Sequence, residues 1–444
     1  MSLNLNSKKK TPATIVQINI QVVCVFMFFL GNISCRAVSR ILRFFQQIKH
    51  FNFEKVPHWS SVSNWVCLAG LGLLQNVKSW DNKRWIAIID TSISYTAKKV
   101  LVVLRLSLDH FTINSCAPTL ADVECIGLEL GDIWNHETVK EALERVFKKS
   151  GNPSAIVKDG GYDLRKGVQF WGRENKECLQ ISDVGHVVAN ELKKLYAKNE
   201  IFKSFLKLIN SARSRLCMTA FAFLRPPKIR TKGRFQNISK VVKWSQRILS
   251  LLAVSGQVKK NSLVYKLREV IPGLRKYRLF ISNFSRDCEI SNDFMEELKN
   301  NGLNQKTYKV AKQILEKLPS QSSLRVNLLL WLNKHIHIQC QLKMCQTPLL
   351  VSSDSIESLM GHIKHVIERN PLQEFGRMVL ATPLFCGKLT QLEIEESMNK
   401  ISHRELQSWQ EKHTKDSMRK KRREVFAEYD CGDGVQNPPI ARSA

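Results

Sequence analysis

Acidic residues are scarce in this chain of 444 residues, because 39 Asp and Glu face 68 Lys and Arg and leave a formal net charge of +29. A surplus of this size points to a polyanionic partner, either nucleic acid or an acidic membrane surface. The 12 cysteines are scattered and no cleavable signal pattern accompanies them, so we expect no disulfide framework and a reducing, intracellular compartment. The hydrophobic share of 43% and the charged share of 24% exclude a wholly disordered or collagen-like chain.

A long uninterrupted apolar run is also lacking. Residues 15–33 form the most apolar stretch, but its unbroken part, residues 22–30, is too short to cross a bilayer, and the rest is interrupted by Gln17, Asn19, Gln21 and Asn32. A signal peptide is disfavoured because Arg36, Arg40 and Arg43 follow in place of a small-residue cleavage site. We therefore expect a buried helix here, with a membrane element as the alternative.

Helical periodicity dominates the first 80 residues. Ser34 can cap one helix, and Ser60 or Ser61 can cap another that Gly70 ends. Two or three short amphipathic helices with a basic surplus are typical of a helix-turn-helix domain, and a generic small helical bundle is the alternative.

The pattern changes at Trp85 and becomes that of an α/β layer. Three runs rich in Ile, Val and Leu predict strands at 85–94, 98–109 and 125–134. A helix at 136–149, a strand at 154–159, a short helix from 163 and a fifth strand at 178–183 follow. This succession predicts a mixed α/β sheet with helices packed on it, which is the order that a ribonuclease H-like core requires.

The basic surplus is concentrated in one region. Residues 196–280 hold 20 Lys or Arg and only two acids, Glu200 and Glu269, so this window contributes +18 of the total +29. From His186 to about Leu350 the periodicity is almost entirely helical, which predicts a basic helical insertion. We expect a helical DNA-binding domain, the first part of the core, the insertion, the core helix that carries Glu357 and a charged tail, over residues 1–80, 81–190, 191–350, 351–390 and 391–444.

Three carboxylates carry the candidate chemistry. Asp90 ends the apolar run WIAIID, Asp159 ends SAIVKD, and Glu357 lies in the helical segment SSDSIESLMGHIKH. An ion at the end of an apolar strand is costly unless it is paired, and carboxylates from separate segments commonly hold hard divalent cations. A turn or cap residue is the usual role of a single Asp at a strand end. All three together favour a metal site for phosphoryl transfer. If they converge without metal, their repulsion should raise at least one pKa.

The sequence resembles a family at these motifs. IDTSIS around Asp90, KDGGYDLRKG around Asp159, DVGH at 183–186 and SDSIESLMGHIKH around Glu357 look like the signature of bacterial insertion-sequence transposases, the DDE enzymes built on a ribonuclease H-like core. The resemblance runs from about Thr14 to Gly387 and includes SCRAVSRIL, HWSSVSNWV and, as its most specific part, the glutamate motif with IKHVIERNPLQEFGRMVL.

The resemblance implies a function and a cofactor. It places the metal-binding triad on Asp90, Asp159 and Glu357, and it implies Mg²⁺ or Mn²⁺, nicking at transposon ends and joining of the free 3′-OH to target DNA. A synaptic homodimer or higher assembly on double-stranded DNA, in the cytoplasm near the nucleoid, would follow. The alternatives are a ribonuclease H-like nuclease or resolvase without strand transfer, and a non-catalytic DNA-binding derivative; a membrane-tethered protein is disfavoured.

Further residues are candidates for supporting roles. Asp183 and His186 could assist a water or a metal, or cap and orient the helix that begins there. Lys364 could meet a phosphate or be a solvated surface lysine. The candidate DNA contacts are Ser63 and Asn64, for discrimination between sequences, and Arg225, Lys228, Arg230, Lys232, Arg234 and Trp244 in the insertion.

Three other patterns have a plain structural reading as well. Trp244 could stack on an unpaired base, although a tryptophan at helical spacing with apolar neighbours is more often part of a core. HIHIQCQLKMC, residues 335–345, matches no standard zinc spacing and is typical of a buried segment. RKKRR at 419–423 resembles a nuclear localisation run, but a basic tail on a DNA-binding protein needs no such address.

Overall fold

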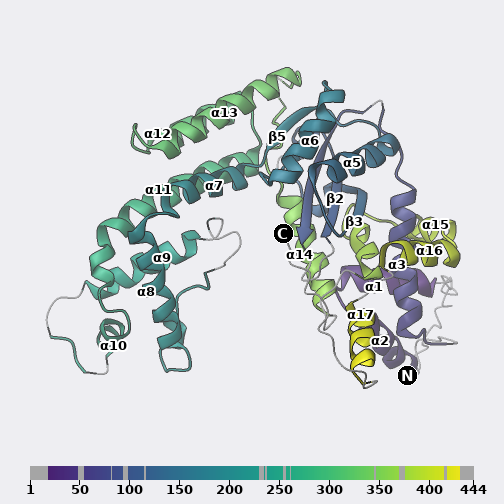
Figure 1. The fold of residues 1–444 in the computed structure, drawn as a ribbon, viewed down its shortest axis with the longest axis horizontal. Coiled ribbons are helices and arrows are strands. Elements are labelled where there is room, and N and C mark those ends of the chain that lie inside the picture. Colours follow the sequence, from purple (N-terminus) through teal and green to yellow (C-terminus); the bar gives the residue numbers. More distant parts are fainter. Residues whose placement is uncertain are drawn as a thin grey trace, which may run out of the picture. The chain divides into compact units, whose positions relative to one another are not determined.

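The computed structural model describes residues 19–48, 55–81, 83–93, 99–114, 117–229, 235, 238–253, 257–260, 262–344, 347–369, 376–414 and 418–430. The chain divides into two compact units (Figure 1). Unit 1 combines residues 1–76 with 362–444, and unit 2 spans residues 77–361.

Unit 2 contains a mixed five-stranded sheet in the order β3-β2-β1-β4-β5. The strands are β1 Trp85–Ile93, β2 Lys99–Ser107, β3 Glu124–Gly131, β4 Ala155–Lys158 and β5 Leu179–Ser182. β1 pairs antiparallel with β2 and β2 with β3, whereas β4 runs parallel to both β1 and β5. The runs predicted as strands therefore form strands, and no end differs from its predicted position by more than three residues.

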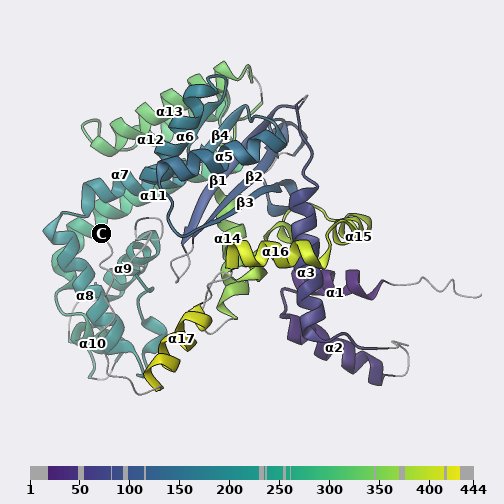
Figure 2. The same ribbon diagram turned by 45° about the vertical axis from the view of Figure 1, so that its right-hand side comes forward.

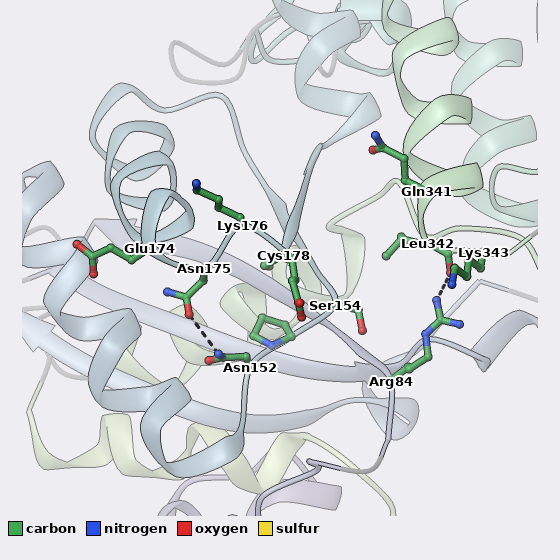
Figure 3. A pocket seen from close by; sticks show the side chains of 12 residues that line it. Arg84, Asn152, Ser154, Glu174, Asn175, Lys176, Cys178, Gln341, Leu342 and Lys343 are labelled. Carbon is green, nitrogen blue, oxygen red and sulfur yellow. Dashed lines mark hydrogen bonds between the residues drawn. The ribbon is translucent and has the colours of Figure 1, made fainter.

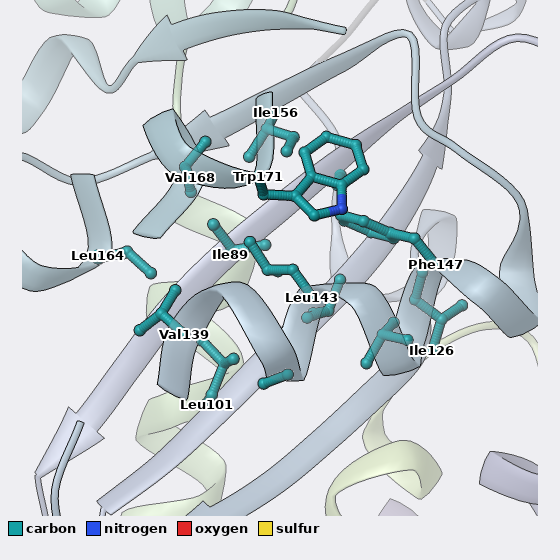
Figure 4. Close-up of a cluster of buried hydrophobic side chains, with 14 of the residues drawn as sticks. Ile89, Leu101, Ile126, Val139, Leu143, Phe147, Ile156, Leu164, Val168 and Trp171 are labelled. Atoms are coloured by element: carbon teal, nitrogen blue, oxygen red, sulfur yellow. The ribbon is translucent and has the colours of Figure 1, made fainter. Parts of the chain in front are cut away.

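Helices α5 and α6 cover one face of this sheet and build its core (Figure 4). The predicted amphipathic helix is α5, and Val139, Leu143 and Phe147 on its inner face pack with Ile89 of β1 and Trp171 of α6. The amino-terminal half of α14 lies on the other face of the sheet (Figure 2). The sheet is thus sandwiched between helices, as expected for an α/β layer. The elements around it are α4 His110–Ile113, η1 Leu120–Asp122, α5 His136–Ser150, α6 Tyr162–Glu174, α7 Val184–Tyr196 and α14 Asp354–Glu368.

The predicted helical insertion consists of helices throughout its described residues. They are α8 Glu200–Leu216, η2 Ala222–Leu224, α9 Ile238–Leu252, α10 Leu263–Val270, η4 Leu274–Tyr277, α11 Arg278–Asn301, α12 Gln305–Glu316 and α13 Ser323–Gln341. α7 and α11 run side by side, and α13 packs against both α7 and α12 (Figure 2). The segment HIHIQC belongs to α13, and its buried residues His335 and Ile338 follow a helical spacing.

Unit 1 is all-helical, and α3 is its central element. It contains α1 Ile20–Leu30, α2 Cys35–Gln47, α3 Trp59–Gln75, η5 Arg377–Phe385, α15 Gln391–Lys400, α16 His403–Thr414 and α17 Met418–Asp430. The predicted charged tail therefore begins with helices, and α15 packs on α3. Ser34 caps α2 as predicted, because its side chain accepts a hydrogen bond from the backbone N–H of Ala37 at 3.1 Å.

Two expectations for this unit are wrong at helix ends. α3 is capped by His58, not by Ser60 or Ser61, and it continues past Gly70 to Gln75. Gly70 does not end the helix because it permits a close approach: a Cβ there would lie 1.7 Å from the carbonyl oxygen of Leu380. Gly72 has the same role, since a Cβ there would lie 2.0 Å from the carbonyl oxygen of Ser397.

The apolar segment near the N-terminus forms a short helix. α1 has 11 residues, and Val22, Cys24, Val25 and Phe28 are buried in unit 1. Across the part of the chain that the structure describes, no helix combines the length and apolarity needed to cross a membrane.

Candidate active site

Two of the three candidate carboxylates lie on neighbouring parallel strands. Ile89 of β1 pairs with Lys158, the last residue of β4, so Asp90 and Asp159 are the next residues in register and are neighbours. Asp159 directly follows β4, whereas β1 continues past Asp90 to Ile93, so Asp90 does not end its strand. Ile89 packs into the core under α5 and α6. Because side chains alternate along a strand, Asp90 points to the opposite face of the sheet. The register of two adjacent strands thus brings together residues that are 69 positions apart in the sequence (159 minus 90).

The protonation of Asp90 is strongly perturbed. Its pKa is raised from 3.8 to about 7, chiefly by burial and next by the negative charge of Asp159, with a smaller contribution from Glu357. The backbone N–H of Thr91, which donates to Asp90 Oδ1 at 2.6 Å, and the charge of His186 act in the opposite direction. The three carboxylates therefore lie within electrostatic reach of one another, and repulsion between them raises one pKa in the expected direction.

The turn after Asp159 fixes that side chain. Asp159 Oδ1 accepts a hydrogen bond at 2.8 Å from the backbone N–H of Gly161, which is the residue that precedes α6. A Cβ on Gly161 would lie 3.0 Å from the same oxygen, so glycine at this position leaves space for the Asp159 carboxylate. Gly161 thus holds the Asp159 carboxylate close to the start of α6.

Glu357 reaches the site from α14 and is bound by His186 of α7. His186 Nε2 lies 3.3 Å from Glu357 Oε1. This hydrogen bond is the largest cause that raises the pKa of His186 to about 9; the charges of Asp183, Asp159 and Glu357 act in the same direction, and burial opposes them. His186 is therefore protonated at neutral pH and donates to the carboxylate. The Glu357 side chain remains 48% exposed, so it is accessible from solvent.

Asp183 anchors two helices at once. Its Oδ1 accepts from the backbone N–H of His186 at 2.6 Å and so caps α7, while its Oδ2 accepts from the backbone N–H and the hydroxyl of Ser353 at 2.6 and 2.9 Å. Ser353 precedes α14, and its carbonyl accepts the N–H of Glu357 at 3.2 Å. Burial raises the pKa of Asp183, which is only 2% exposed. Both carboxylate oxygens are engaged, so Asp183 positions His186 and Glu357 through the backbone.

The donor set fits a divalent cation only in part. Mg²⁺ is usually held by one or two carboxylates together with waters and substrate phosphates, and Asp90 and Asp159 supply such a pair, whose repulsion a cation would relieve. Glu357 is engaged by His186 instead. Accordingly, no group of three His, Cys, Asp or Glu side chains among the described residues is arranged to hold a metal ion.

Sequence reasoning missed a buried lysine beside this site. Lys158 is 5% exposed, and its pKa is lowered to about 8 by burial and by the charges of Lys334 and Arg165. Lys334 belongs to α13, which is fixed on β5 because His335 Nε2 accepts the N–H of Ser182 at 3.0 Å. The sequence did contain a signal for this buried lysine, because Lys158 directly follows the apolar residues Ala155, Ile156 and Val157. His335 is buried, and burial lowers its pKa to about 4.

Three further candidates, Lys364, Ser63 and Asn64, belong to unit 1. Lys364 is exposed on α14, seven positions beyond Glu357. Ser63 is buried, and both Ser63 and Asn64 accept hydrogen bonds from the guanidinium of Arg377, at 2.8 and 2.6 Å. These contacts give Ser63 and Asn64 a structural role within unit 1, and their part in DNA discrimination stays a prediction.

The candidate residues of the basic insertion are only partly described. Trp244 is half-buried, and its indole N–H donates to the carbonyl of Leu224 at 2.9 Å, as in a core residue. Arg225 contacts Cys217 Sγ at 3.6 Å, and Lys228 is exposed. The other three predicted contacts, Arg230, Lys232 and Arg234, lie outside the described residues. Of the residues weighed for zinc, His337 and Cys340 are exposed on α13, and Cys345 also lies outside the described residues.

A cavity of about 760 Å³ lies at the other end of the strands (Figure 3). Arg84, Ser154 and Cys178 line it, and each precedes the first residue of a strand, so it opens at the amino ends of β1, β4 and β5. Arg84 donates to the carbonyl of Leu342 there, and Asn152 to Asn175 at 3.2 Å. The cavity is therefore separate from Asp90, which is the sixth residue of β1, and from Asp159, which follows the last residue of β4.

Neither a comparison with protein-family models nor one with curated protein sequences found a match. Among solved structures, the chain is similar to a chain of the Drosophila P element transposase strand transfer complex, with 11% sequence identity and a TM-score of 0.42. The match covers 82% of this chain and 90% of that chain. A similarity of this size leaves the function to be argued from the site itself.

Proposed function

We propose that this chain is a DNA transposase that cleaves DNA at transposon ends in a divalent-metal-dependent reaction and joins the free 3′-OH to target DNA. The observation that carries the proposal is the placement of Asp90, within β1, beside Asp159, which directly follows the adjacent parallel strand β4, with Glu357 within electrostatic reach. A strand order of β3-β2-β1-β4-β5 with this mixture of parallel and antiparallel pairs also suits a ribonuclease H-like core.

The residues of the site have separate roles under this proposal. Mg²⁺ or Mn²⁺ bound by Asp90 and Asp159 would activate the attacking oxygen and stabilise the leaving oxygen. Protonated His186 holds Glu357 beside them, and Asp183 fixes both residues by capping α7 and by binding Ser353. With its pKa near 7, Asp90 retains a proton in part of the molecules at neutral pH, and this proton must leave before Asp90 can bind a cation.

The proposed partner is double-stranded DNA. The +18 charge of residues 196–280 is suited to phosphate contacts, which supply most of the sequence-independent affinity of DNA-binding proteins. Arg225 and Lys228 with the predicted contacts Arg230, Lys232 and Arg234 would bind backbone phosphates. A homodimer or higher assembly would hold two ends together.

A cleavage and strand-transfer assay tests the proposal. The donor is a duplex made from the DNA that flanks the gene, incubated with the full chain, a target plasmid and Mg²⁺ or Mn²⁺. Asp159→Asn is nearly isosteric, so we expect DNA binding to persist while cleavage falls by orders of magnitude. Asp163→Asn is the matched control, because Asp163 is exposed in the first turn of α6 and its loss removes the same charge. We expect this control to cleave like the wild type.

The products distinguish the alternatives. Nicks without joining to the plasmid would indicate a nuclease or resolvase. Binding without any metal-dependent cleavage by the wild type would indicate a non-catalytic derivative and refute the proposal. Equal cleavage by wild type and Asp159→Asn would refute the role of the carboxylates.

A further inference from the structure

Helix α2 of unit 1 presents a continuous cationic face. Arg36, Arg40 and Arg43 follow one another at spacings of four and three residues, so they lie on one side of the helix over about 10 Å. All three side chains are exposed. The helix, CRAVSRILRFFQQ, contains no acidic residue that could neutralise them.

The opposite face of α2 fixes this orientation. Val38 and Leu42 are buried and α2 packs against α3, while the hydroxyl of Ser39 donates to the carbonyl of Pro57 at 2.9 Å. Because Val38 and Leu42 face α3, the arginines lie on the outward side of α2, together with the exposed Phe44.

The arginines have no acidic partner in the described part of the chain, where none of the three takes part in an ion pair or hydrogen bond with another side chain. Arg36 instead places its guanidinium 5.1 Å from the ring centroid of Trp59, the first residue of α3. Such a cation–π contact orients the guanidinium without neutralising its charge. The face is therefore both charged and partly pre-organised.

Helix α3, in contrast, has little free surface for a ligand. It packs against α1, α2, η5, α15 and α16, and Gly70 and Gly72 bring the backbones of Leu380 and Ser397 into direct contact with it. A helix enclosed in this way offers little surface to a DNA groove. This favours α2 over α3, on which the sequence-based expectation placed Ser63 and Asn64.

We propose that α2 binds duplex DNA by placing Arg36, Arg40 and Arg43 on backbone phosphates. The inference rests on the proposed function, because it takes its ligand from there, and it locates a contact surface of unit 1. Guanidinium groups suit phosphates, since they form paired hydrogen bonds with two oxygens. An anionic membrane is the less suitable ligand. A helix that lies in a membrane interface inserts an apolar face, whereas Val38 and Leu42 of α2 are buried against α3 and only Phe44 among its large apolar side chains is strongly exposed.

The test measures DNA affinity as a function of salt, with the full chain in an Asp159→Asn background so that the DNA stays intact. The variant Arg36→Gln/Arg40→Gln/Arg43→Gln should flatten the slope of log K against log[salt] by up to about 0.9 for each phosphate that is no longer bound. The matched control replaces the exposed Lys400, Arg404 and Lys412 of the same unit with Gln, which removes the same charge from regions rich in Glu. It should leave the slope unchanged. A triple Arg→Lys variant of α2 keeps the charge and should retain the slope.

Each outcome decides one claim. A wild-type slope in a Gln variant with normal thermal unfolding would overturn the α2 inference, and so would equal slope losses in variant and control. If the triple variant fails to fold, the single change Arg40→Glu, on the exposed face, carries the same test. Loss of binding to phosphatidylserine vesicles with intact DNA binding would show a membrane ligand and also overturn the inference. A failure of the proposed function gives a different result. The wild type would show no metal-dependent cleavage, and its DNA binding would still depend on the arginines of α2.

Discussion

The burial of Asp90 beside Asp159 should make the free energy of unfolding depend on pH, and this dependence can be measured directly. The folded protein binds the Asp90 proton more tightly than the unfolded chain does, since the pKa is about 7 in the fold and 3.8 without it. The stability that this proton contributes is fully present below pH 3.8 and is lost as the pH rises through about 7.

The perturbation is Asp90→Asn, which removes the ionisable group and keeps its size. Each pKa unit corresponds to about 1.4 kcal/mol. Because Asp90 ionises more readily in the unfolded chain than in the fold, the fold is less stable by about 2 kcal/mol at pH 5 and by about 4 kcal/mol at pH 8 than it is well below pH 3.8. We expect Asp90→Asn to be more stable than the wild type, and its advantage to grow by about 2 kcal/mol between these two pH values. His186 stays protonated over this range because its pKa is about 9.

The assay is urea unfolding at pH 5 and pH 8 in the presence of a chelator, with Asp163→Asn as the control for loss of an exposed carboxyl group. Because the charge of Asp159 is the second cause of the shift, Asp159→Asn should reduce the dependence on pH without abolishing it. Adding Mg²⁺ at pH 8 should stabilise the wild type and leave Asp90→Asn unaffected. A stability difference between Asp90→Asn and wild type that is the same at both pH values would refute the reasoning.

Two further changes test the packing around the site and in unit 1. Gly70→Ala places a Cβ 1.7 Å from the carbonyl oxygen of Leu380, so we expect a loss of about 3 kcal/mol in unfolding free energy and faster amide exchange in α3; unchanged exchange would contradict the close contact. Asp183→Ala leaves the N–H groups of His186 and Ser353 without their acceptor, which should cost about 3 kcal/mol in urea unfolding and lower cleavage with it; wild-type stability would show that these hydrogen bonds contribute little.

Much of the sheet could be predicted because its signals are local. The apolar runs at 85–94, 98–109 and 125–134 are long enough to identify strands, and Asp90 stands out because a carboxyl group follows five apolar residues. Ser34 was likewise identifiable as a helix cap from its immediate neighbours.

The features that could not be predicted depend on residues far apart in the sequence. Gly70 has the signature of a helix end, and its actual role needs Leu380, 310 positions later (380 minus 70). Ser63 looks like an exposed DNA contact in the sequence, but in the structure it is buried and accepts a hydrogen bond from Arg377. The hydrogen bond between His186 and Glu357 joins two helices whose packing no local pattern specifies.

The hydrogen bonds between Asp183 and Ser353 join parts of the chain that the ribosome synthesises at different times. Asp90 and Glu357 are separated by 267 positions (357 minus 90), and at about 5–20 residues per second a ribosome needs roughly 13–53 s to cover them. During that time the sheet can form and Asp183 is already present, but Glu357 has not yet been synthesised. Under the proposed function, an unfinished or prematurely ended chain would carry the basic insertion without a complete set of carboxylates. Such a chain could occupy DNA without cutting it, so that the ability to break the genome arrives only with the last part of the polypeptide.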